Sequence, residues 1–540
     1  MKTPKLIEKA RRRLQVEVAH HKNDRRFAAF ASQVVANLPE RNTAPVVFFD
    51  VSTRLTGVSL NAAFAALSAW SLELKGIRVI HFVCQRGLAP CILGTHRSAL
   101  HQKPPCGGCI HQSAALFEQS EVVSFGFDAE ALPSGLLEPL GLAELSQFTY
   151  ADMPLGELTL PAMRWILRKH HLNDDELTRS LFRKYITSAY SLALQFEALI
   201  REKHPQAVVV FNGMQYPEAT ARWVARKHGI RVISHEVGLG PFSGYFTEGD
   251  ATAYNLDIPA DFQLNDAQNQ RLDDYLSKRF KGDFHMAGVK FWPEMSELSP
   301  RFLQQAASFK QMVPVFTNVI FDTSQPHANV LFEDMFVWLD SLLVTVKANP
   351  ETLFVIRAHP DEARVGKASE ESVSDWAASR GVKNIPNLQF FPPQEYVNSY
   401  DLIRMSKFVL IYNSTIGLEA AILGAAVLSA GKARFTASDV VWLPKSISAY
   451  QEKLDSLLKT DAIEVPAHFR HNARRFLYWQ LYRSSLSFND FLKADGIWAG
   501  YVTLNDFPVQ ALLPENSATM RTIQDGILRG GDFMLKEDQK

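Results

Sequence analysis

The stretch FVLIYNSTIGLEAAILGAAVLS, residues 408–429, predicts a strand, a polar turn, a helix and a second strand in direct succession. Residues 408–412 are apolar and include aromatic and β-branched side chains, which is typical of a buried strand. Asn413, Ser414 and Thr415 then interrupt the apolar run before the helical residues 417–423 and the strand residues 426–429. The stretch is long enough to cross a membrane, but its polar turn and its glycines favour a buried β-α-β unit.

The same alternation of strand and helix patterns extends along the chain on both sides of this unit. Strands are expected at residues 45–50, 77–84, 207–211, 230–234, 313–318 and 353–357, and helices at residues 61–74, 217–228, 332–348 and 468–482. Such alternation is typical of parallel sheets built from β-α-β units. The pattern becomes polar and irregular over residues 262–300 and then restarts. We therefore expect an α/β protein of two Rossmann-like, doubly wound domains that face a central cleft.

This pattern divides the chain into four segments. Residues 1–40 are expected to form a basic helical segment, and residues 41–300 the N-terminal Rossmann-like domain, with a cysteine-rich loop at residues 84–111. Residues 301–465 are expected to form the C-terminal Rossmann-like domain, and residues 466–540 helices that pack back on the N-terminal domain.

Composition excludes several classes of protein. Of the 540 residues, 46% are apolar and 21% are charged, which is ordinary globular usage and excludes a disordered or collagenous chain. Lysine plus arginine and aspartate plus glutamate both number 57, so the net charge gives no indication of nucleic-acid binding. No apolar segment follows the basic N-terminus as in an export signal, so a cytoplasmic protein is expected. A basic helix can also contact an anionic membrane from its inner face, although a solvated helix explains the same residues.

Polar residues gather where two expected strands of the second domain end. In open parallel sheets, ligands bind outside the carboxyl ends of the strands. Arginine and histidine can donate hydrogen bonds to a phosphate there, and a helix N-terminus presents free N–H groups to it. The alternative is a structural arginine, a satisfied histidine and a plain helix cap. The candidates for an anion site are Arg357, His359, Asn413, Ser414, Thr415, Gly417 and Glu419.

Two common nucleotide-binding motifs are absent from the sequence. No GxGxxG follows an expected strand, which argues against a dinucleotide cofactor, and no GxxxxGK[ST] is present, which argues against a P-loop ATPase. The remaining interpretation is a nucleotide sugar that helix ends bind in a cleft between two domains.

The order of these short motifs resembles the GT-B glycosyltransferases of bacterial capsule and surface-polysaccharide synthesis, including polysialyltransferases and Kdo-type capsule transferases. The resemblance covers most of the chain and rests on an acidic residue before a glycine, a His-Pro pair and a Ser-Thr pair. These are Glu236 with Gly238, His359 with Pro360, and Ser414 with Thr415. Asn212 with Gly213, Thr317 with Asn318, and Asp322 belong to the same pattern.

The resemblance implies roles for these residues. His359, Ser414 and Thr415 would hold the donor phosphate, Glu419 the donor sugar or ribose, and Glu236 would be the general base on the acceptor hydroxyl. Asp50 is the second candidate for the base. For Glu236 the alternative is a carboxylate paired with Arg231 or Arg222. Asn318 completes the donor-binding set, and the acceptor-side set is Thr56, Gly57, Asn212 and Gly213.

All four cysteines lie within one short segment, at Cys84, Cys91, Cys106 and Cys109. The last two form a C-x-x-C with two glycines between them, which suits a metal knuckle. We expect a structural zinc ion, with an iron–sulfur cluster as the alternative. Free thiols or a redox pair would explain the same residues, and His96, His101 or His111 can replace a cysteine ligand.

The predicted function is transfer of a sugar from a nucleotide-sugar donor to a glycan or lipid-linked acceptor in bacterial surface-polysaccharide synthesis. A sugar-nucleotide epimerase or a polyol-phosphate transferase would use the same fold. A non-catalytic, metal-bearing scaffold of envelope assembly is the third alternative.

Overall fold

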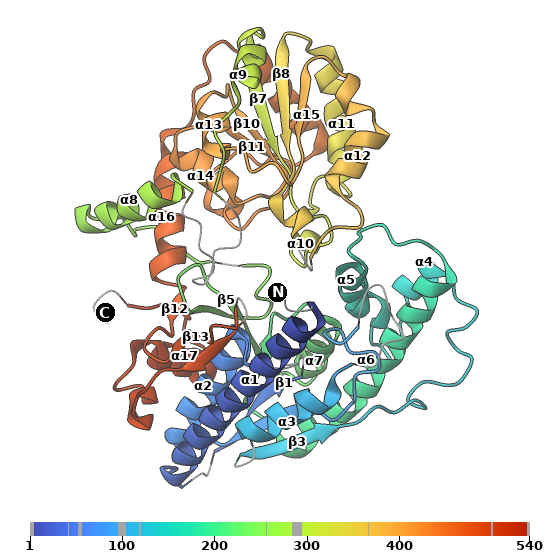
Figure 1. The fold of residues 1–540 in the computed structure, drawn as a ribbon, viewed down its shortest axis with the longest axis vertical. Helices are drawn as coiled ribbons and strands as arrows, with labels where there is room; N and C mark the ends of the chain where they lie inside the picture. The colour runs from blue at the N-terminus through green and yellow to red at the C-terminus, as the bar shows by residue number, and fades with distance from the viewer. Residues whose placement is uncertain are drawn as a thin grey trace.

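The computed structural model describes residues 5–40, 43–51, 57–95, 104–117, 120–254, 256–282, 294–364, 367–497 and 500–536. Within them the chain forms two α/β domains, each built on its own sheet. They lie one above the other in Figure 1, with β7, β8, β10 and β11 in the upper domain. This is the architecture of two Rossmann-like domains that the strand pattern predicts, and the one that the resemblance to GT-B enzymes implies.

The N-terminal sheet has seven strands in the order β12-β6-β5-β4-β1-β2-β3. Its five parallel strands are β1 (Val46–Asp50), β2 (Val79–Cys84), β3 (Glu121–Phe125), β4 (Ala207–Phe211) and β5 (Arg231–Val237). The remaining two, β6 (Ser243–Glu248) and β12 (Leu486–Ser487), are antiparallel. The strict alternation of strand and helix did not predict this antiparallel edge, because β6 follows β5 after a short turn.

Alternate residues of β1 explain why helices cover both faces of this sheet. Val46 and Phe48 join one apolar cluster, and Val47 and Phe49 join another. The first cluster packs against α2 (Leu60–Leu74) and α17 (Ala518–Arg529), and the second against α5 (Leu155–Leu167), α6 (Glu176–Lys203) and α7 (Tyr216–Lys227). A parallel sheet needs both faces buried, and these helices bury them.

The C-terminal sheet is wholly parallel, in the order β11-β10-β7-β8-β9. Its strands are β7 (Gln311–Phe316), β8 (Thr352–Arg357), β9 (Leu388–Phe391), β10 (Val409–Ile411) and β11 (Val427–Ser429). One face packs against α8 (Asp266–Arg279), α13 (Ser399–Arg404), α14 (Ile416–Ile422) and α16 (Ala467–Tyr482). The other face packs against α11 (Met335–Ala348), α12 (Val373–Ser379) and α15 (Ile447–Lys459).

The carboxyl ends of both sheets point toward the junction of the domains. The short helix α10 (Gln325–Ala328), which follows β7, lies at the edge of the upper domain that faces the lower one (Figure 1). Its His327 Nε2 lies 2.9 Å from Asp250 Oδ2, just after β6 of the N-terminal domain. Loops that follow parallel strands carry binding residues in such folds, so the site is sought at this junction.

The end of the chain connects the two domains. Helix α16 packs against α14 of the C-terminal domain, after which β12 pairs with β6 and α17 packs on α2 in the N-terminal domain. Between them, β13 (Leu492–Ala494) pairs antiparallel with β14 (Val502–Leu504). The last segment therefore contacts both domains, and the four segment limits stay predictions.

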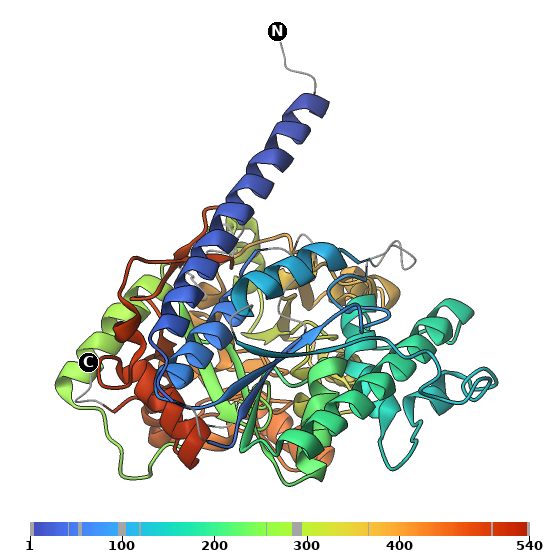
Figure 2. The ribbon, with the colours of Figure 1, turned by 90° about the horizontal axis from the view of Figure 1, so that it is seen from below.

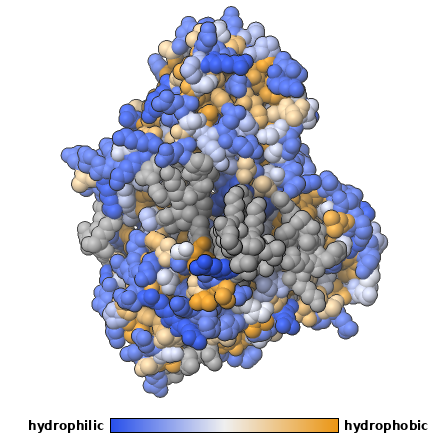
Figure 3. Space-filling model, viewed as in Figure 1, coloured by the Kyte–Doolittle hydropathy of each residue, from blue (hydrophilic) through white to orange (hydrophobic). Residues whose placement is uncertain are grey.

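The second half of the N-terminal helix α1 (Lys5–Ala36) packs on the N-terminal domain. Phe27, Phe30 and Val34 are buried in the core, and Asn23 Nδ2 donates to the carbonyl of Val502 at 2.8 Å. The first half projects from the body of the molecule (Figure 2). In the view of Figure 3 the surface is mainly hydrophilic, with scattered hydrophobic residues. Within the described part of the chain, the search for a helix long and apolar enough to cross a membrane found none.

The polar stretch predicted as a link contains the 14-residue helix α8. Its sequence has few apolar residues, but Asn265 and Gln268 form a capping box at its start. The remaining helices are α3 (Cys106–Phe117), α4 (Leu142–Ser146) and α9 (Pro300–Ala307).

Candidate donor and acceptor sites

A pocket of about 140 Å³ lies where β7 and β8 end and α14 begins. It brings together Arg357, His359, Ser414, Thr415 and Glu419, five of the residues singled out in the sequence. Arg279, Thr317 and Tyr396 also line it. Pockets for whole drug-sized ligands measure roughly 300–1,000 Å³, so this one suits a phosphate group with the rest of a ligand lying in the cleft.

Arg357 is a buried cation that forms no ion pair with a carboxylate among the described residues. It ends β8, is 5% exposed, and its Nη1 donates to the carbonyl of Ala358 at 2.6 Å. Its Nε is buried without a hydrogen-bond partner, and no carboxylate of the described residues forms an ion pair with it. Burial lowers the pKa of Arg357 to about 10. A buried, unpaired guanidinium is costly, and a bound anion would relieve that cost.

His359 presents one donor beside this arginine. Its Nδ1 accepts the backbone N–H of Asp361 at 3.2 Å. Burial lowers the pKa of the ring, so it is neutral at pH 7. In the neutral ring the proton then lies on Nε2, which can donate to a phosphate oxygen.

The Ser-Thr pair stands at the start of α14. Thr415 occupies the N-cap position without a side-chain cap bond and is exposed, whereas Ser414 is 8% exposed. The alternative of a plain side-chain cap at Thr415 is therefore wrong.

Asn318 and Asn413 do not line the pocket. Asn318 Nδ2 donates to Asn413 Oδ1 at 2.8 Å, and Asn318 Oδ1 accepts the N–H of Val319 at 2.8 Å. The pair joins the ends of β7 and β10 beside the pocket. Their predicted direct contact with the donor is not supported by this arrangement.

Gly417 has a packing role. A Cβ at this position would lie 2.4 Å from Ile411 Cδ1 and 3.2 Å from Phe435 Cζ. The missing side chain lets α14 approach β10, and contact of the Gly417 backbone with a ligand stays a prediction.

Glu419 already holds two partners. Its Oε1 lies 2.7 Å from Arg279 Nε and 2.6 Å from Arg279 Nη2, and its Oε2 accepts from the Tyr400 hydroxyl at 2.5 Å. These bonds fix Arg279 of α8 at the pocket wall. Sequence analysis missed Arg279 because α8 was not predicted. The capping box at Asn265 was the available signal.

Glu236 is oriented by two asparagines at the end of β5. Its Oε1 accepts from Asn61 Nδ2 at 3.1 Å, and its Oε2 accepts from Asn212 Nδ2 at 2.8 Å. The predicted alternative of an arginine pair is wrong. Arg231 pairs with Glu248 at 2.9 Å, and Arg222 lies 3.6 Å from Asp250. Neutral amides leave the carboxylate able to accept a proton.

The turn after β4 places one of these asparagines. Asn212 and Gly213 both have positive φ, at 56° and 91°, a conformation that asparagine and glycine tolerate best. The Asn212 Oδ1 accepts the N–H of Met214 at 3.1 Å, which turns its Nδ2 toward Glu236. These two acceptor-side residues thus act on the candidate base.

The other candidates of the N-terminal domain are less available. Asp50 is 5% exposed, and its Oδ2 lies 2.7 Å from Nδ1 of the buried His81, so its prediction as a base is not supported. Gly57 packs against Tyr501 and His20, since an added Cβ would lie 2.8 Å from the Tyr501 ring. Thr56 lies outside the described residues.

Glu236 lies on the cleft side of its domain. The charges of Glu236 and Arg434 both act on the Tyr254 hydroxyl, and the Arg434 guanidinium lies 4.1 Å from the Tyr254 ring centre. Arg434 follows β11 of the C-terminal domain. The loop after β11 therefore contacts the N-terminal domain at Tyr254.

The four cysteines lie around one corner of the N-terminal sheet. Cys84 ends β2, and Cys106 and Cys109 lie in the first turn of α3, a helix in place of the predicted glycine knuckle. Burial raises the pKa of Cys84, and it raises that of Cys91 to about 12. No disulfide joins these four residues. Among the described residues, one set of histidine, cysteine or acidic side chains brings three ligand atoms within 4.8 Å of one another, and that set contains none of these cysteines.

The metal at the cysteines stays a prediction with a direct test. We expect elemental analysis of protein purified without a metal-binding tag to show zinc, of which about one equivalent per chain is lost in Cys106→Ser with lower thermal stability, because four thiolates close a zinc shell. Iron with a brown colour would indicate a cluster. Four titratable thiols with no metal would contradict both.

Comparisons with known proteins found distant structural similarity. No protein-family model and no curated protein matches the chain. Similar solved structures include a β-Kdo 2,4-transferase, KpsC of Thermosulfurimonas dismutans, at 12% identity and a TM-score of 0.35, covering 57% of this chain and 87% of that one. The β-Kdo 2,7-transferase KpsC of the same organism matches at 14% identity and a TM-score of 0.30, over 59% and 87%. The UDP-GlcNAc 2-epimerase of Neisseria meningitidis, bound to UDP-GlcNAc, matches at 14% identity and a TM-score of 0.22, over 80% and 97%.

Proposed function

We propose that the protein is a glycosyltransferase that moves a sugar from a nucleotide-sugar donor to a hydroxyl of a glycan or lipid-linked acceptor. The observation that carries the proposal is the buried Arg357 guanidinium, whose Nε has no hydrogen-bond partner among the described residues, beside the His359 donor in a pocket at the end of a parallel sheet. A nucleotide sugar supplies the phosphate that such a pocket requires.

In this proposal each domain has one task. Arg357, His359 and Ser414 bind and orient the donor phosphate and stabilise the charge that grows on it as the sugar leaves. Glu236, held by Asn61 and Asn212, accepts the proton of the attacking acceptor hydroxyl. Charge stabilisation in one domain and proton removal in the other would together drive the transfer.

A lipid-linked acceptor would place the protein at the inner face of a membrane. Helix α1 projects from the body and carries Arg11 together with the exposed Leu14 and Val18. We include contact of this helix with an anionic membrane in the proposal.

A screen of nucleotide sugars by thermal shift tests the function. A cognate donor at about a hundred times its dissociation constant should stabilise the fold by about 2.7 kcal/mol. The cognate donor should then release free nucleotide only when an acceptor glycan is added. Interconversion of the donor without acceptor would indicate an epimerase, and no shift with any nucleotide sugar would contradict the proposal.

A further inference from the structure

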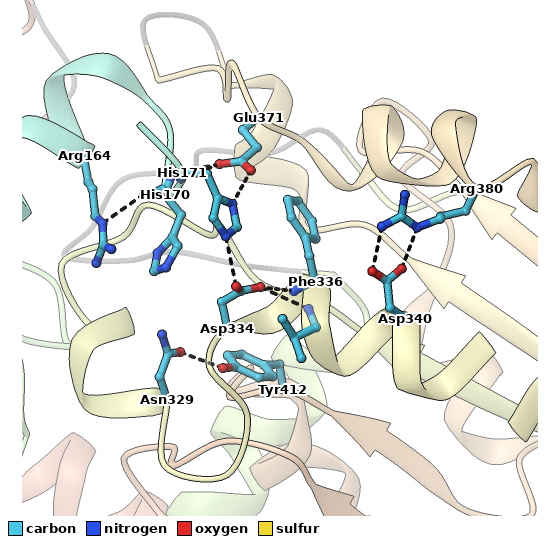
Figure 4. A network of polar contacts seen from close by, with 11 residues as sticks. Arg164, His170, His171, Asn329, Asp334, Phe336, Asp340, Glu371, Arg380 and Tyr412 are labelled. Atoms are coloured by element: carbon cyan, nitrogen blue, oxygen red, sulfur yellow. Dashed lines mark hydrogen bonds and ion pairs between the residues drawn. The ribbon is translucent and has the colours of Figure 1, made fainter. Parts of the chain in front are cut away.

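A second polar cluster joins the two domains (Figure 4). His170 and His171 lie between α5 and α6 of the N-terminal domain, and Asp334 precedes α11 of the C-terminal domain. One ligand atom from each of these three residues lies within 4.8 Å of the others. Glu371, also from the C-terminal domain, contacts the same histidines.

Asp334 has one oxygen engaged by its helix and one directed at the histidines. Its Oδ1 accepts the N–H groups of Phe336 at 2.6 Å and Val337 at 3.1 Å, which caps α11. Its Oδ2 lies 3.0 Å from His171 Nε2. Because Asp334 is only 1% exposed, the helix cap fixes the direction of this second oxygen.

Glu371 fixes the orientation of the His171 ring. Its Oε1 lies 2.6 Å from His171 Nδ1, and its Oε2 accepts the backbone N–H groups of His170 at 2.8 Å and His171 at 3.0 Å. When Nδ1 carries the ring proton, the lone pair of Nε2 faces the Asp334 oxygen. A cation, either a second ring proton or a metal ion, then joins Nε2 to the Asp334 oxygen 3.0 Å away. A carboxylate behind a histidine is also the usual outer partner of a metal-bound imidazole.

His170 supplies a third ligand. It is 7% exposed, and its ring lies edge-on to His171 with the ring centres 4.9 Å apart. Its carbonyl accepts from Arg164 Nε at 3.0 Å, but no hydrogen bond is found for its ring nitrogens among the described residues. A ring nitrogen of His170 can therefore offer its lone pair to an ion.

We propose that His170, His171 and Asp334 bind one divalent transition-metal ion that bridges the two domains. Imidazole nitrogens favour zinc-like ions over magnesium or calcium. Glu371 acts as the outer partner of His171, and the Asp334 and Glu371 carboxylates offset the ion's charge together with that of nearby Arg164. An ion held from both sides would limit how far the cleft opens. The site shares no residue with the donor pocket.

Cobalt(II) binding to the full chain tests this site, because its spectrum separates nitrogen and oxygen ligands from thiolates. We expect one equivalent of Co²⁺ to bind without a thiolate charge-transfer band and to be displaced by Zn²⁺. His170→Ala and Asp334→Asn should each abolish that equivalent. Asparagine keeps the helix cap, so Asp334→Asn should remain folded. Glu371→Gln should weaken binding by about 10–100-fold.

His468→Ala provides the matched control. His468 forms an ordinary surface pair with Asp439 at 2.8 Å, and both side chains are more than half exposed. Its variant should bind Co²⁺ as the unmodified chain does. Equal Co²⁺ binding by His170→Ala and Asp334→Asn would overturn the proposal. So would the absence of binding, or binding lost only in Cys106→Ser.

Discussion

Glu236→Gln is expected to lower the turnover number by about 10²–10⁴-fold, the range typical of a lost general base, with donor affinity unchanged. Glutamine keeps the length and shape of the side chain and can still accept from Asn61 or Asn212. It cannot take up the proton of the acceptor hydroxyl. Steady-state turnover with the cognate donor and acceptor, together with donor affinity by calorimetry, measures both quantities.

Glu248→Gln is the matched control for this variant. Glu248 lies on the neighbouring strand β6, where it forms an exposed pair with Arg231, and exposed pairs contribute about 0–1 kcal/mol. Its turnover should stay within about two-fold of the unmodified chain. If the turnover number of Glu236→Gln stays within a few-fold of that of the unmodified chain, Glu236 has a structural role instead. Asp50 would not replace it, because its carboxylate is bonded to His81 in the core.

Arg357→Met is expected to weaken donor binding by about 10–150-fold, which corresponds to loss of a charge-assisted hydrogen bond at about 1.5–3 kcal/mol. The variant should not lose stability. Arg357 is 5% exposed and lacks an ion-pair partner among the described residues, and replacing an unpaired buried charge by an apolar side chain removes a desolvation cost. Calorimetric titration with donor and urea unfolding without donor separate the two effects.

His359→Ala and Ser414→Ala should weaken donor binding in the same direction, because their groups line the same pocket. Arg380→Met is the control. Arg380 forms an exposed ion pair with Asp340 at 2.7 Å on the outer surface of this domain. If all three pocket variants bind the donor as tightly as Arg380→Met, the phosphate site lies elsewhere.

Eight of the twelve strands of the two sheets followed from local patterns in the sequence, whereas β3, β6, β9 and β12 were not predicted. The run at residues 207–211 coincides with β4, and the run at residues 353–357 lies within β8 (Thr352–Arg357). Parallel strands are buried on both faces, so they stand out as continuous apolar runs between polar turns. The order of the motifs could be recognised in the sequence for the same reason, because each motif directly follows an apolar run of this kind.

Contacts between distant segments could not be predicted in this way. The ion pair of Arg279 with Glu419 spans 140 residues, and the bonds of Glu236 to Asn61 and Asn212 span 175 and 24 residues. Helix α8 was missed because its face toward the core contains few apolar residues, among them Leu272 and Leu276. The antiparallel strand β6 was missed because SGYFTE has no apolar alternation.

The sequence by itself determined the α/β class, the two doubly wound sheets and the position of Arg357, His359, Ser414 and Thr415 at strand and helix ends. These depend on local periodicity and turn chemistry, which neighbouring residues carry. Only the tertiary structure decided which polar groups are already paired. It placed Asp50 against His81, Glu419 against Arg279 and Glu236 between two amides. It also brought His171 of one domain to Asp334 of the other. A side chain's charge is satisfied by whatever folding places within about 3 Å of it, and sequence spacing does not encode that distance.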